Sequence, residues 1–314
     1  MKYGVISYPK SINMGDEVQS VAARRLLPRV DHYIDRDTIN KPVTEEKVKL
    51  ICNGWFTDNP NIWPPAKNLI PLFISFHLTR SNKSYKLLAS KELKDYYKQF
   101  GPVGCRDLGT LDLFKKNGID AYYSGDLTLT LENKFTERNE DILLVDPLRH
   151  NYRPGYREHI VNQLVPKKYR DQVKHIKQRR VNLDASVEER FEDAEKLIEM
   201  YSKAKIVITS RIHCALPCLA LGTPVYFIKA GYHSVLYSLN DRFEGVLDMF
   251  RVINEDAFPY SSNSPVDLGC RLLNFYKGSN IKPLPIDWEN PEPNSFDFSD
   301  LKQELSDKVK SFIS

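Results

Sequence analysis

Residues 206–228 read IVITSRIHCALPCLALGTPVYFI, and this stretch predicts the fold of the chain. The apolar run Ile206–Thr209 favours a buried strand, residues 215–221 favour a helix, and residues 225–228 favour a second buried strand. Gly222 to Pro224 form the turn between that helix and the second strand. Strand, helix and strand in succession are typical of a parallel sheet, because the helix carries the chain back to the starting edge.

The same alternation extends outward from this stretch. Strands are predicted at residues 3–7, 47–52, 69–77, 102–107, 121–126, 142–145 and 181–183. Helices are predicted between residue 17 and Pro28, at 91–100, 110–117, 187–203 and 297–313, and in a basic segment ending near residue 178. Several strands end in polar or acidic residues, which places ligands at the carboxyl ends of a mostly parallel sheet.

The polar stretch 132–141 is the candidate linker between two α/β domains with a cleft between them. We expect an N-terminal domain at residues 1–136 and a second domain at 137–262. Residues 263–314 are expected to form a C-terminal extension that ends in the helix predicted at 297–313.

Composition excludes several classes of protein. The chain has 314 residues, of which 41% are hydrophobic and 27% charged, so it is neither disordered nor a coiled coil as a whole. No window approaches the about 18 apolar residues that would cross a bilayer. A net charge of +4 is too small to indicate nucleic acid. Five scattered cysteines and an N-terminus without the apolar core of a signal peptide predict a reducing, cytoplasmic setting.

The strongest candidate site is the segment from Ser210 to His213, where a buried strand meets a helix. The first turn of a helix presents free N–H groups, so Ser210 and Ile212 are expected to help bind a ligand there. Arg211 can grip a carboxylate or phosphate, and His213 can exchange a proton near neutral pH. The alternative is an arginine paired with an acid at the domain interface and a packed histidine.

A second candidate is the loop from Asn13 to Glu17. Gly15 permits close approach of the backbone, and Asp16 is a candidate general base or acceptor of a sugar hydroxyl. Asn13 and Gly15 are expected to contact substrate. The alternative is that Asp16 is a plain helix N-cap and that Glu17 favours the helix dipole.

Further candidates follow other strands. Arg149 and His150 lead a basic cluster after the strand at 142–145, and Lys229 follows the strand at 225–228. Asp126 lies at a strand end, where it is either an acid of the cleft or a turn residue. We interpret Arg106 and Asp107 mainly as a structural pair at the start of a helix. The remaining aromatic and histidine singletons, including Trp55, Trp63, His77 and His233, are interpreted as core or surface residues.

Taken in order, these motifs resemble the polysaccharide pyruvyl transferase family over roughly residues 3–250. The resemblance rests on Asn13-Met14-Gly15-Asp16-Glu17, Arg106-Asp107 with Thr110 and Leu113, Asp126, and Ser210-Arg211-Ile212-His213 with Gly222-Thr223-Pro224. It implies two Rossmann-like α/β domains facing a cleft, the GT-B-type architecture of glycosyltransferases, with the acceptor on the first domain and the donor on the second. In that architecture the terminal helix is expected to pack back on the first domain. It also implies transfer of the pyruvyl unit of phosphoenolpyruvate onto two saccharide hydroxyls, which forms a cyclic ketal in surface polysaccharide biosynthesis.

Such a donor carries a carboxylate and a phosphate, so its site needs the positive charge of Arg211, Arg149 and the helix start. His213 is expected to donate a proton to C3 of the donor or to assist departure of phosphate, and Asp16 or Asp126 to accept the hydroxyl proton. No metal and no cofactor beyond phosphoenolpyruvate are expected. The expected acceptor is a saccharide, free or lipid-linked, met at the inner face of the membrane.

Two other functions use the same residues. A nucleotide-sugar glycosyltransferase of GT-B fold would also need arginine and helix starts for a diphosphate. A non-catalytic saccharide-binding protein would keep the fold without turnover. Incubation with phosphoenolpyruvate or with nucleotide sugars separates these functions.

Overall fold

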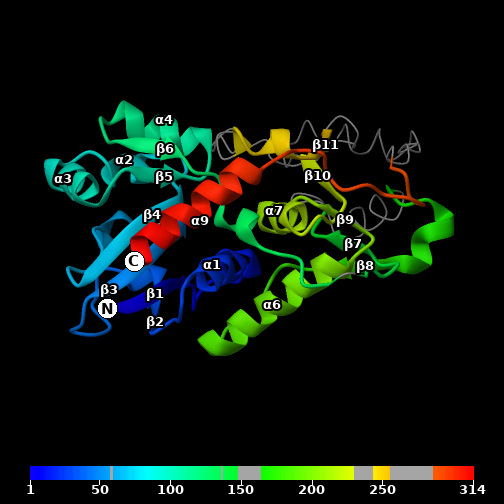
Figure 1. Cartoon of the computed structure of the whole chain (residues 1–314), viewed down its shortest axis with the longest axis horizontal. Helices are drawn as coiled ribbons and strands as arrows, with labels where there is room; N and C mark the ends of the chain where they lie inside the picture. Colours follow the sequence, from blue (N-terminus) through cyan, green and yellow to red (C-terminus); the bar gives the residue numbers. More distant parts are fainter. Residues whose placement is uncertain (57–58, 136, 148–163, 230–242, 255–285) are drawn as a thin grey trace, which may run out of the picture.

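The computed structural model describes residues 1–56, 59–135, 137–147, 164–229, 243–254 and 286–314. Two parallel sheets lie side by side along the long axis of the molecule (Figure 1). We call them, with the helices that cover them, the first lobe and the second lobe. Two parallel sheets flanked by helices confirm the predicted pair of Rossmann-like α/β domains.

The first sheet has the strand order β2-β1-β3-β4-β5-β6. Its strands are β1 Lys2–Ser7, β2 His32–Asp35, β3 Val48–Trp55, β4 Leu69–His77, β5 Val103–Cys105 and β6 Ala121–Tyr123. The order reverses direction between β1 and β3, and α/β sheets bind ligands beside the carboxyl ends of strands at such a switch point. β3 continues past its predicted end to Trp55, with a register shift against β4 between Cys52 and Gly54.

The second sheet has the strand order β11-β10-β9-β7-β8. Its strands are β7 Ile142–Val145, β8 Val173–Ile176, β9 Ile206–Thr209, β10 Val225–Lys229 and β11 Arg251–Asn254. Its switch point lies between β7 and β9. The strand, helix and strand predicted from residues 206–228 are therefore confirmed, with β9 and β10 pairing in parallel.

The helices are α1 Met14–Leu26, α2 Asn82–Lys86, α3 Lys91–Phe100, α4 Leu108–Lys116, α6 Val187–Lys203, α7 Ile212–Ala220 and α9 Ser299–Ile313. The 3₁₀ turns are η1 Arg36–Thr38, η2 Pro60–Ile62, η3 Leu127–Thr130, η4 Lys167–Gln172 and η6 Leu247–Met249. Capping side chains explain where several helices begin: Asn13 caps α1, Ser90 caps α3, and Ser186 caps α6 in a capping box with Glu189.

Two predictions about elements are wrong. The basic segment ending near residue 178 is not helical in its described part, which forms η4 and then the strand β8. Residues 181–183 do not form a strand, and Val181 is 97% exposed. The short strands β2 and β11 were not predicted. Edge strands of four residues show too few alternations for a period to be recognised, so pairing with a neighbour decides them.

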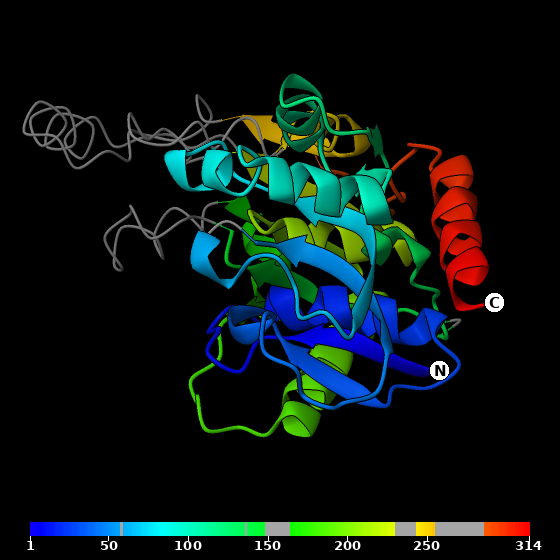
Figure 2. The same cartoon turned by 90° about the vertical axis from the view of Figure 1, so that its left-hand side faces the viewer.

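One hydrophobic core joins the two lobes. Buried side chains of β1 and α1, such as Val5 and Val18, belong to the same cluster as Phe191 of α6 and Val207 of β9. A second cluster of buried side chains fills the opposite face of the first sheet, beneath α3 and α4. Figure 2 shows these helices from that end of the molecule. Because α1 packs on both its own sheet and α6, the relative position of the lobes is set by apolar burial.

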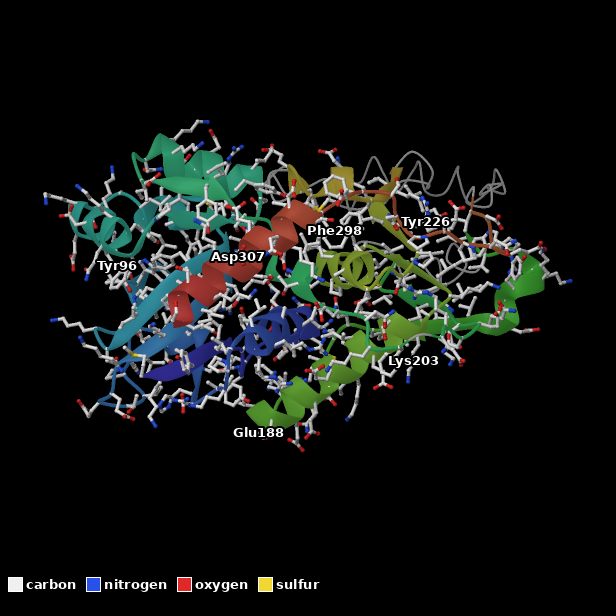
Figure 3. The ribbon with its side chains drawn as sticks, viewed as in Figure 1. Tyr96, Glu188, Lys203, Tyr226, Phe298 and Asp307 are labelled. Atoms are coloured by element: carbon white, nitrogen blue, oxygen red, sulfur yellow. The ribbon has the colours of Figure 1, made fainter. Side chains whose placement is uncertain are left out.

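The terminal helix α9 lies across the first sheet. Leu305 and Val309 are buried on its inner face, while Asp307 is exposed on the outer face (Figure 3). The Tyr3 hydroxyl donates a hydrogen bond to the carbonyl oxygen of Ile313 at 3.2 Å. At its other end, Phe298 packs against the core cluster that both lobes share. The end of the chain therefore returns to the lobe in which the chain begins.

Candidate active site at the junction of the lobes

His213 lies at the start of α7, directly beyond the switch point of the second sheet. Its backbone angles, φ −82° and ψ 20°, depart from helical values, so the first turn of α7 is kinked at this residue. Its side chain is buried. Gly15 packs against it so closely that a Cβ there would stand 2.9 Å from His213 Cβ. Gly15 thus permits the start of α1 to meet the start of α7, which is the close backbone approach that its position predicted.

The first lobe supplies two polar partners to the His213 ring. Its Nε2 is 3.3 Å from Nη1 of Arg106, which follows β5, and 3.6 Å from Oδ2 of Asp126, which precedes η3. Arg106 and Asp126 are 1% and 2% exposed. The structure therefore brings together an imidazole, a guanidinium and a carboxylate that lie up to 107 residues apart in the chain.

The charges of this cluster are strongly coupled. Burial would raise the pKa of Asp126, but the hydrogen bond and charge of His213, together with Arg106, outweigh it and lower that pKa to about 2. Burial lowers the pKa of His213, as does Arg106, while Asp126 and Asp16 oppose the shift. At neutral pH, Asp126 is therefore ionised and His213 is predominantly neutral. A neutral imidazole beside a carboxylate can take up a proton, because the carboxylate stabilises the cation that forms.

Arg106 is the functional residue that sequence reasoning missed. We predicted a structural pair with Asp107, and Asp107 does cap α4, accepting from the Thr110 amide at 2.8 Å. Arg106, however, reaches across the junction to His213. Within the described ranges its buried Nη2 has no hydrogen-bond partner. The signal available in the sequence was an arginine placed directly after a buried strand, at the edge where α/β sheets bind ligands.

Asp16 is not the cap of α1, so the plain N-cap interpretation is wrong. Asn13 is the cap, and its side-chain oxygen accepts from the Gly15 amide at 3.2 Å. The two carboxylate oxygens of Asp16 accept hydrogen bonds from the side-chain amide of Asn13 at 2.9 Å and from the Ser11 hydroxyl at 2.6 Å. Asp16 is half-buried beside the cluster, close enough for its charge to act on His213.

Arg211 and Ser210 both donate hydrogen bonds to Asp146, the residue that follows β7. Nε of Arg211 donates to Asp146 Oδ2 at 3.0 Å, and the Ser210 hydroxyl donates to the Asp146 carbonyl oxygen at 2.7 Å. Asp146 has a positive φ of 39°, which is uncommon for a residue other than glycine and is typical of functional loops. Arg211 is therefore paired with an acid through its Nε, as the alternative interpretation predicted. The rest of its side chain is not fully enclosed, since the side chain is 26% exposed.

Gln178 is a second residue that the sequence analysis missed. Unlike Arg106, it has no signal in the sequence. Its side-chain Nε2 donates to the carbonyl oxygen of His213 at 2.8 Å, and its backbone N–H donates to Asp146 Oδ2 at 3.1 Å. Its own carbonyl oxygen accepts from the Met14 amide at 3.3 Å. One buried glutamine thus connects the starts of α1 and α7 with the end of β7.

Other predicted residues are not brought to the His213 ring. The Ile212 side chain is 4% exposed and packs in the core, so only its backbone can face a ligand. Lys229 ends β10, where it lies in register with Asn254 of β11. Arg149 and His150 lie outside the described residues, as does His233.

Of the two arginines predicted to bind the donor, the described ranges contain Arg211 but not Arg149. At the His213 ring the charged groups are Arg106, Asp126 and Asp16, whereas the Arg211 guanidinium pairs with Asp146. Arg106 is buried and Arg211 is partly exposed. Among the described residues no group of three or more His, Cys, Asp or Glu is arranged to hold a metal ion.

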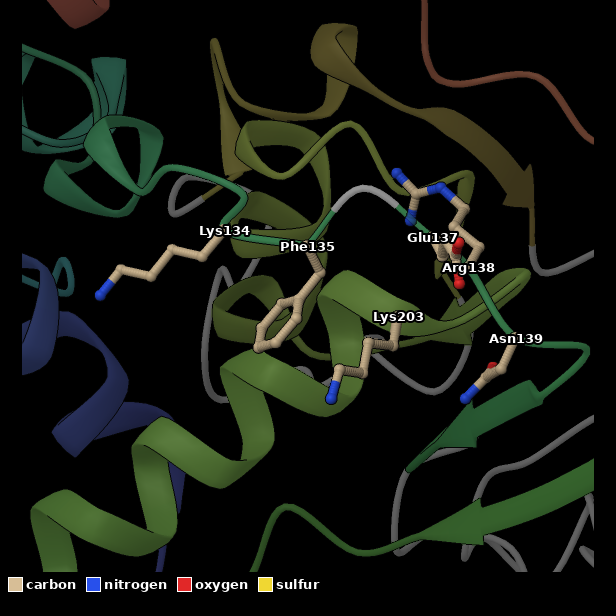
Figure 4. A pocket seen from close by; sticks show the side chains of 6 residues that line it. All are labelled: Lys134, Phe135, Glu137, Arg138, Asn139 and Lys203. Carbon is tan, nitrogen blue, oxygen red and sulfur yellow. The ribbon is translucent and has the colours of Figure 1, made fainter.

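A surface pocket of about 420 Å³ lies away from this cluster, along the segment that joins the lobes (Figure 4). It is lined by Lys134, Phe135, Glu137, Arg138, Asn139 and Lys203. Arg138 donates hydrogen bonds to the carbonyl oxygens of Ser202 and Gly222, and the Lys203 ammonium lies 4.1 Å from the Phe135 ring centre. These contacts fasten the joining segment to the ends of α6 and α7, which is a structural role.

None of the helices in the described ranges is both long enough and apolar enough to cross a bilayer. A comparison with curated proteins finds no match. Among solved structures, the chain is similar to an uncharacterized protein from Klebsiella pneumoniae, with 14% identity and a TM-score of 0.42, over 81% of this chain and 92% of that one.

The chain is also similar to Escherichia coli heptosyltransferase WaaC in complex with ADP, with 11% identity and a TM-score of 0.27, over 88% of this chain and 99% of that one. At these TM-scores the likenesses add nothing to what the strand order already shows. The family model for polysaccharide pyruvyl transferases matches residues 13–231, more than half of the chain, and spans Asn13, Arg106, Asp126 and His213. The chain therefore belongs to the polysaccharide pyruvyl transferase family.

Proposed function

We propose that this transferase moves the enolpyruvyl unit of phosphoenolpyruvate onto two hydroxyls of a saccharide, which forms a cyclic pyruvate ketal. The observation that carries the proposal is the buried cluster at the junction of the lobes, where Arg106 Nη1 and Asp126 Oδ2 both lie within 3.6 Å of His213 Nε2. A guanidinium for an anionic donor and an imidazole for proton transfer are the two groups that this reaction needs.

Arg106 and Arg211 are the proposed donor-binding residues. Arg106 offers a buried Nη2 that, within the described ranges, has no hydrogen-bond partner, and a buried donor without a partner is costly unless a ligand completes it. Arg211 precedes the first turn of α7, whose N-terminal dipole also favours an anion. The carboxylate and the phosphate of one small donor can thus be held from both lobes.

The proton steps are assigned to His213. The first acceptor hydroxyl adds across the C2–C3 double bond of the donor. Its oxygen bonds to C2, its proton passes to neutral His213, and His213 passes a proton on to C3, which becomes a methyl group. The second hydroxyl then bonds to C2, the C2–O bond to phosphate breaks, and that hydroxyl's proton leaves with the phosphate. Asp126, with a pKa of about 2, has too little proton affinity to be the base, so we assign it the role of stabilising protonated His213.

We further propose that the reaction takes place in the cytoplasm, during assembly of a surface polysaccharide whose acceptor is met free or lipid-linked at the inner face of the membrane. The four cysteines in the described part of the chain are buried thiols, in keeping with a reducing compartment.

Mass spectrometry of candidate saccharides incubated with phosphoenolpyruvate tests the proposal. The expected result is an acceptor that gains one pyruvyl ketal for each phosphate released. Parallel incubations with nucleotide sugars provide the comparison. Transfer of a sugar from one of them, with phosphoenolpyruvate untouched, would make the protein a glycosyltransferase. Saccharide binding without turnover of either donor would make it a binding protein.

A further inference from the structure

We propose that His77 is a positioning residue for this reaction, which acts through Asp107 to hold the Arg106 guanidinium against His213. The inference rests on the proposed function for its kinetic consequence only, because the geometry can be tested without substrate. His77 ends β4 and is 2% exposed, and from the sequence it was interpreted as a core or surface residue.

Three distances connect His77 to the candidate site. Its Nδ1 is 2.7 Å from Asp107 Oδ2, and the same oxygen is 3.5 Å from Nε of Arg106. Nη1 of Arg106 is in turn 3.3 Å from His213 Nε2. The imidazole of His77 and the guanidinium of Arg106 therefore share one carboxylate oxygen, on the side of Asp107 that faces the junction.

The other oxygen of Asp107 already accounts for its structural role. Oδ1 accepts from both the backbone N–H and the hydroxyl of Thr110 at 2.8 Å, which caps α4. A cap needs one oxygen, as serine or asparagine shows in the same position of other helices. His77 Nδ1 also lies 3.0 Å from the Thr110 hydroxyl, so part of its contact supports the cap. Its contact with Oδ2 places a buried imidazole against an oxygen that the cap does not use, and this second contact calls for another purpose. Orienting Arg106 is a purpose that the distances support.

His77 limits how closely Arg106 can approach Asp107. While His77 occupies Oδ2 at 2.7 Å, Arg106 Nε remains at 3.5 Å, beyond a short ion-paired hydrogen bond. Without His77, we expect the guanidinium to move toward the freed oxygen and to withdraw Nη1 from His213. Its buried Nη2, which is proposed to meet the donor, would move with it.

The test compares His77→Leu, which removes the nitrogen, with His77→Asn, whose amide nitrogen takes the place of Nδ1. The His213 ring is titrated by NMR in each variant without substrate. The charged groups that act on this ring are Asp126 and Asp16, which raise its pKa, and Arg106, which lowers it. Withdrawal of Arg106 is therefore expected to raise the pKa of His213 in His77→Leu, while His77→Asn retains the wild-type value.

Kinetics supply the second measurement. We expect kcat/KM for phosphoenolpyruvate to fall by about 10- to 100-fold in His77→Leu, mostly through KM, and to be largely restored in His77→Asn. If His77→Leu does not fold by circular dichroism, His77→Gln replaces it, because a glutamine nitrogen lies at the Nε2 position and also loses the contact. An unchanged His213 titration in a folded variant would overturn the inference. If the wild-type protein turns over no phosphoenolpyruvate, the proposed function fails while the titration still decides the geometry.

Discussion

The two neighbouring helices of the second lobe, α6 and α7, begin in opposite ways. α6 begins with a complete capping box, in which the Ser186 hydroxyl accepts from the Glu189 amide and the Glu189 carboxylate accepts from the Ser186 amide. α7 begins at Arg211 with no capping hydrogen bond from a described side chain, and it is kinked at His213. A helix start whose N–H groups are satisfied serves stability, whereas an uncapped one keeps those groups for a ligand.

The difference extends to the arginine that each helix contributes. Arg190 of α6 is 1% exposed and donates to the carbonyl oxygens of Pro9 and Ser11 and to the Glu17 carboxylate, so it clamps the second lobe onto the loop after β1. Among the described residues, Arg211 at the start of α7 pairs with one acid, Asp146, and it remains partly exposed. Arg190 thus serves to hold the lobes together, whereas Arg211 keeps part of its side chain exposed.

The largest effect is expected at α7. His213→Ala should lower kcat by about 10²- to 10⁴-fold, because proton transfer to and from a positioned side chain contributes that much to a rate. Phosphate release from phosphoenolpyruvate plus acceptor measures it, with thermal unfolding as the control for the fold. A variant with near wild-type turnover would remove His213 from the proposed chemistry.

The next effect is expected at the clamp of α6. Burial, reinforced by the charge of Asp16, raises the pKa of Glu17 to about 7 despite the contact with Arg190. Its folded-state pKa thus exceeds its unfolded value of 4.5, so the stability that protonated Glu17 contributes is lost as the pH rises through about 7. Arg190→Met leaves this carboxylate buried without its cation, and should cost about 3–5 kcal/mol at pH 8 and less at pH 5.

Urea unfolding at the two pH values measures the free energy of unfolding of Arg190→Met. Glu17→Gln in the Arg190→Met background is the matched control, because it removes the charge and should cancel the pH dependence. Equal losses at pH 5 and pH 8 would show that Glu17 is not the group responsible.

A smaller effect concerns the pH profile of the site. Because His213 must be neutral to accept a proton, kcat/KM should fall on the acidic side, with an apparent pKa below the ordinary value of 6.5. Asp126 raises the pKa of His213, so Asp126→Asn should shift this limb by about one pH unit or more toward acid, in addition to slowing the reaction. A limb that stays in place in Asp126→Asn would contradict the coupling of the two residues.

The smallest effect is expected at the cap of α6. Ser186→Ala should cost about 1 kcal/mol of stability and leave kcat and KM unchanged, because its hydroxyl accepts only the first-turn amide of its own helix. Denaturant unfolding and steady-state kinetics measure the two outcomes. Altered kinetics in this variant would contradict the purely structural role assigned to the start of α6.

Local sequence was sufficient for most of the secondary structure. The bounds of α3 and α6 match their predicted ranges, and β9, α7 and β10 follow from residues 206–228, since hydrophobic period and caps are properties of short segments. β8 was missed because its side chains at Lys174 and His175 are exposed on an edge strand, where the apolar pattern is weak.

The sequence by itself determined the fold class, the family and the placement of Arg211 and His213 at a strand-to-helix junction, because each depends on residues close together in the chain. Only the tertiary structure decided that Arg106 and Asp126 meet His213, that Gln178 connects two helix starts, and that His77 stands behind Arg106. The contact of Arg106 with His213 alone joins segments 107 residues apart, and both such distances and the burial that shifts the pKa values exist only once the lobes have packed together.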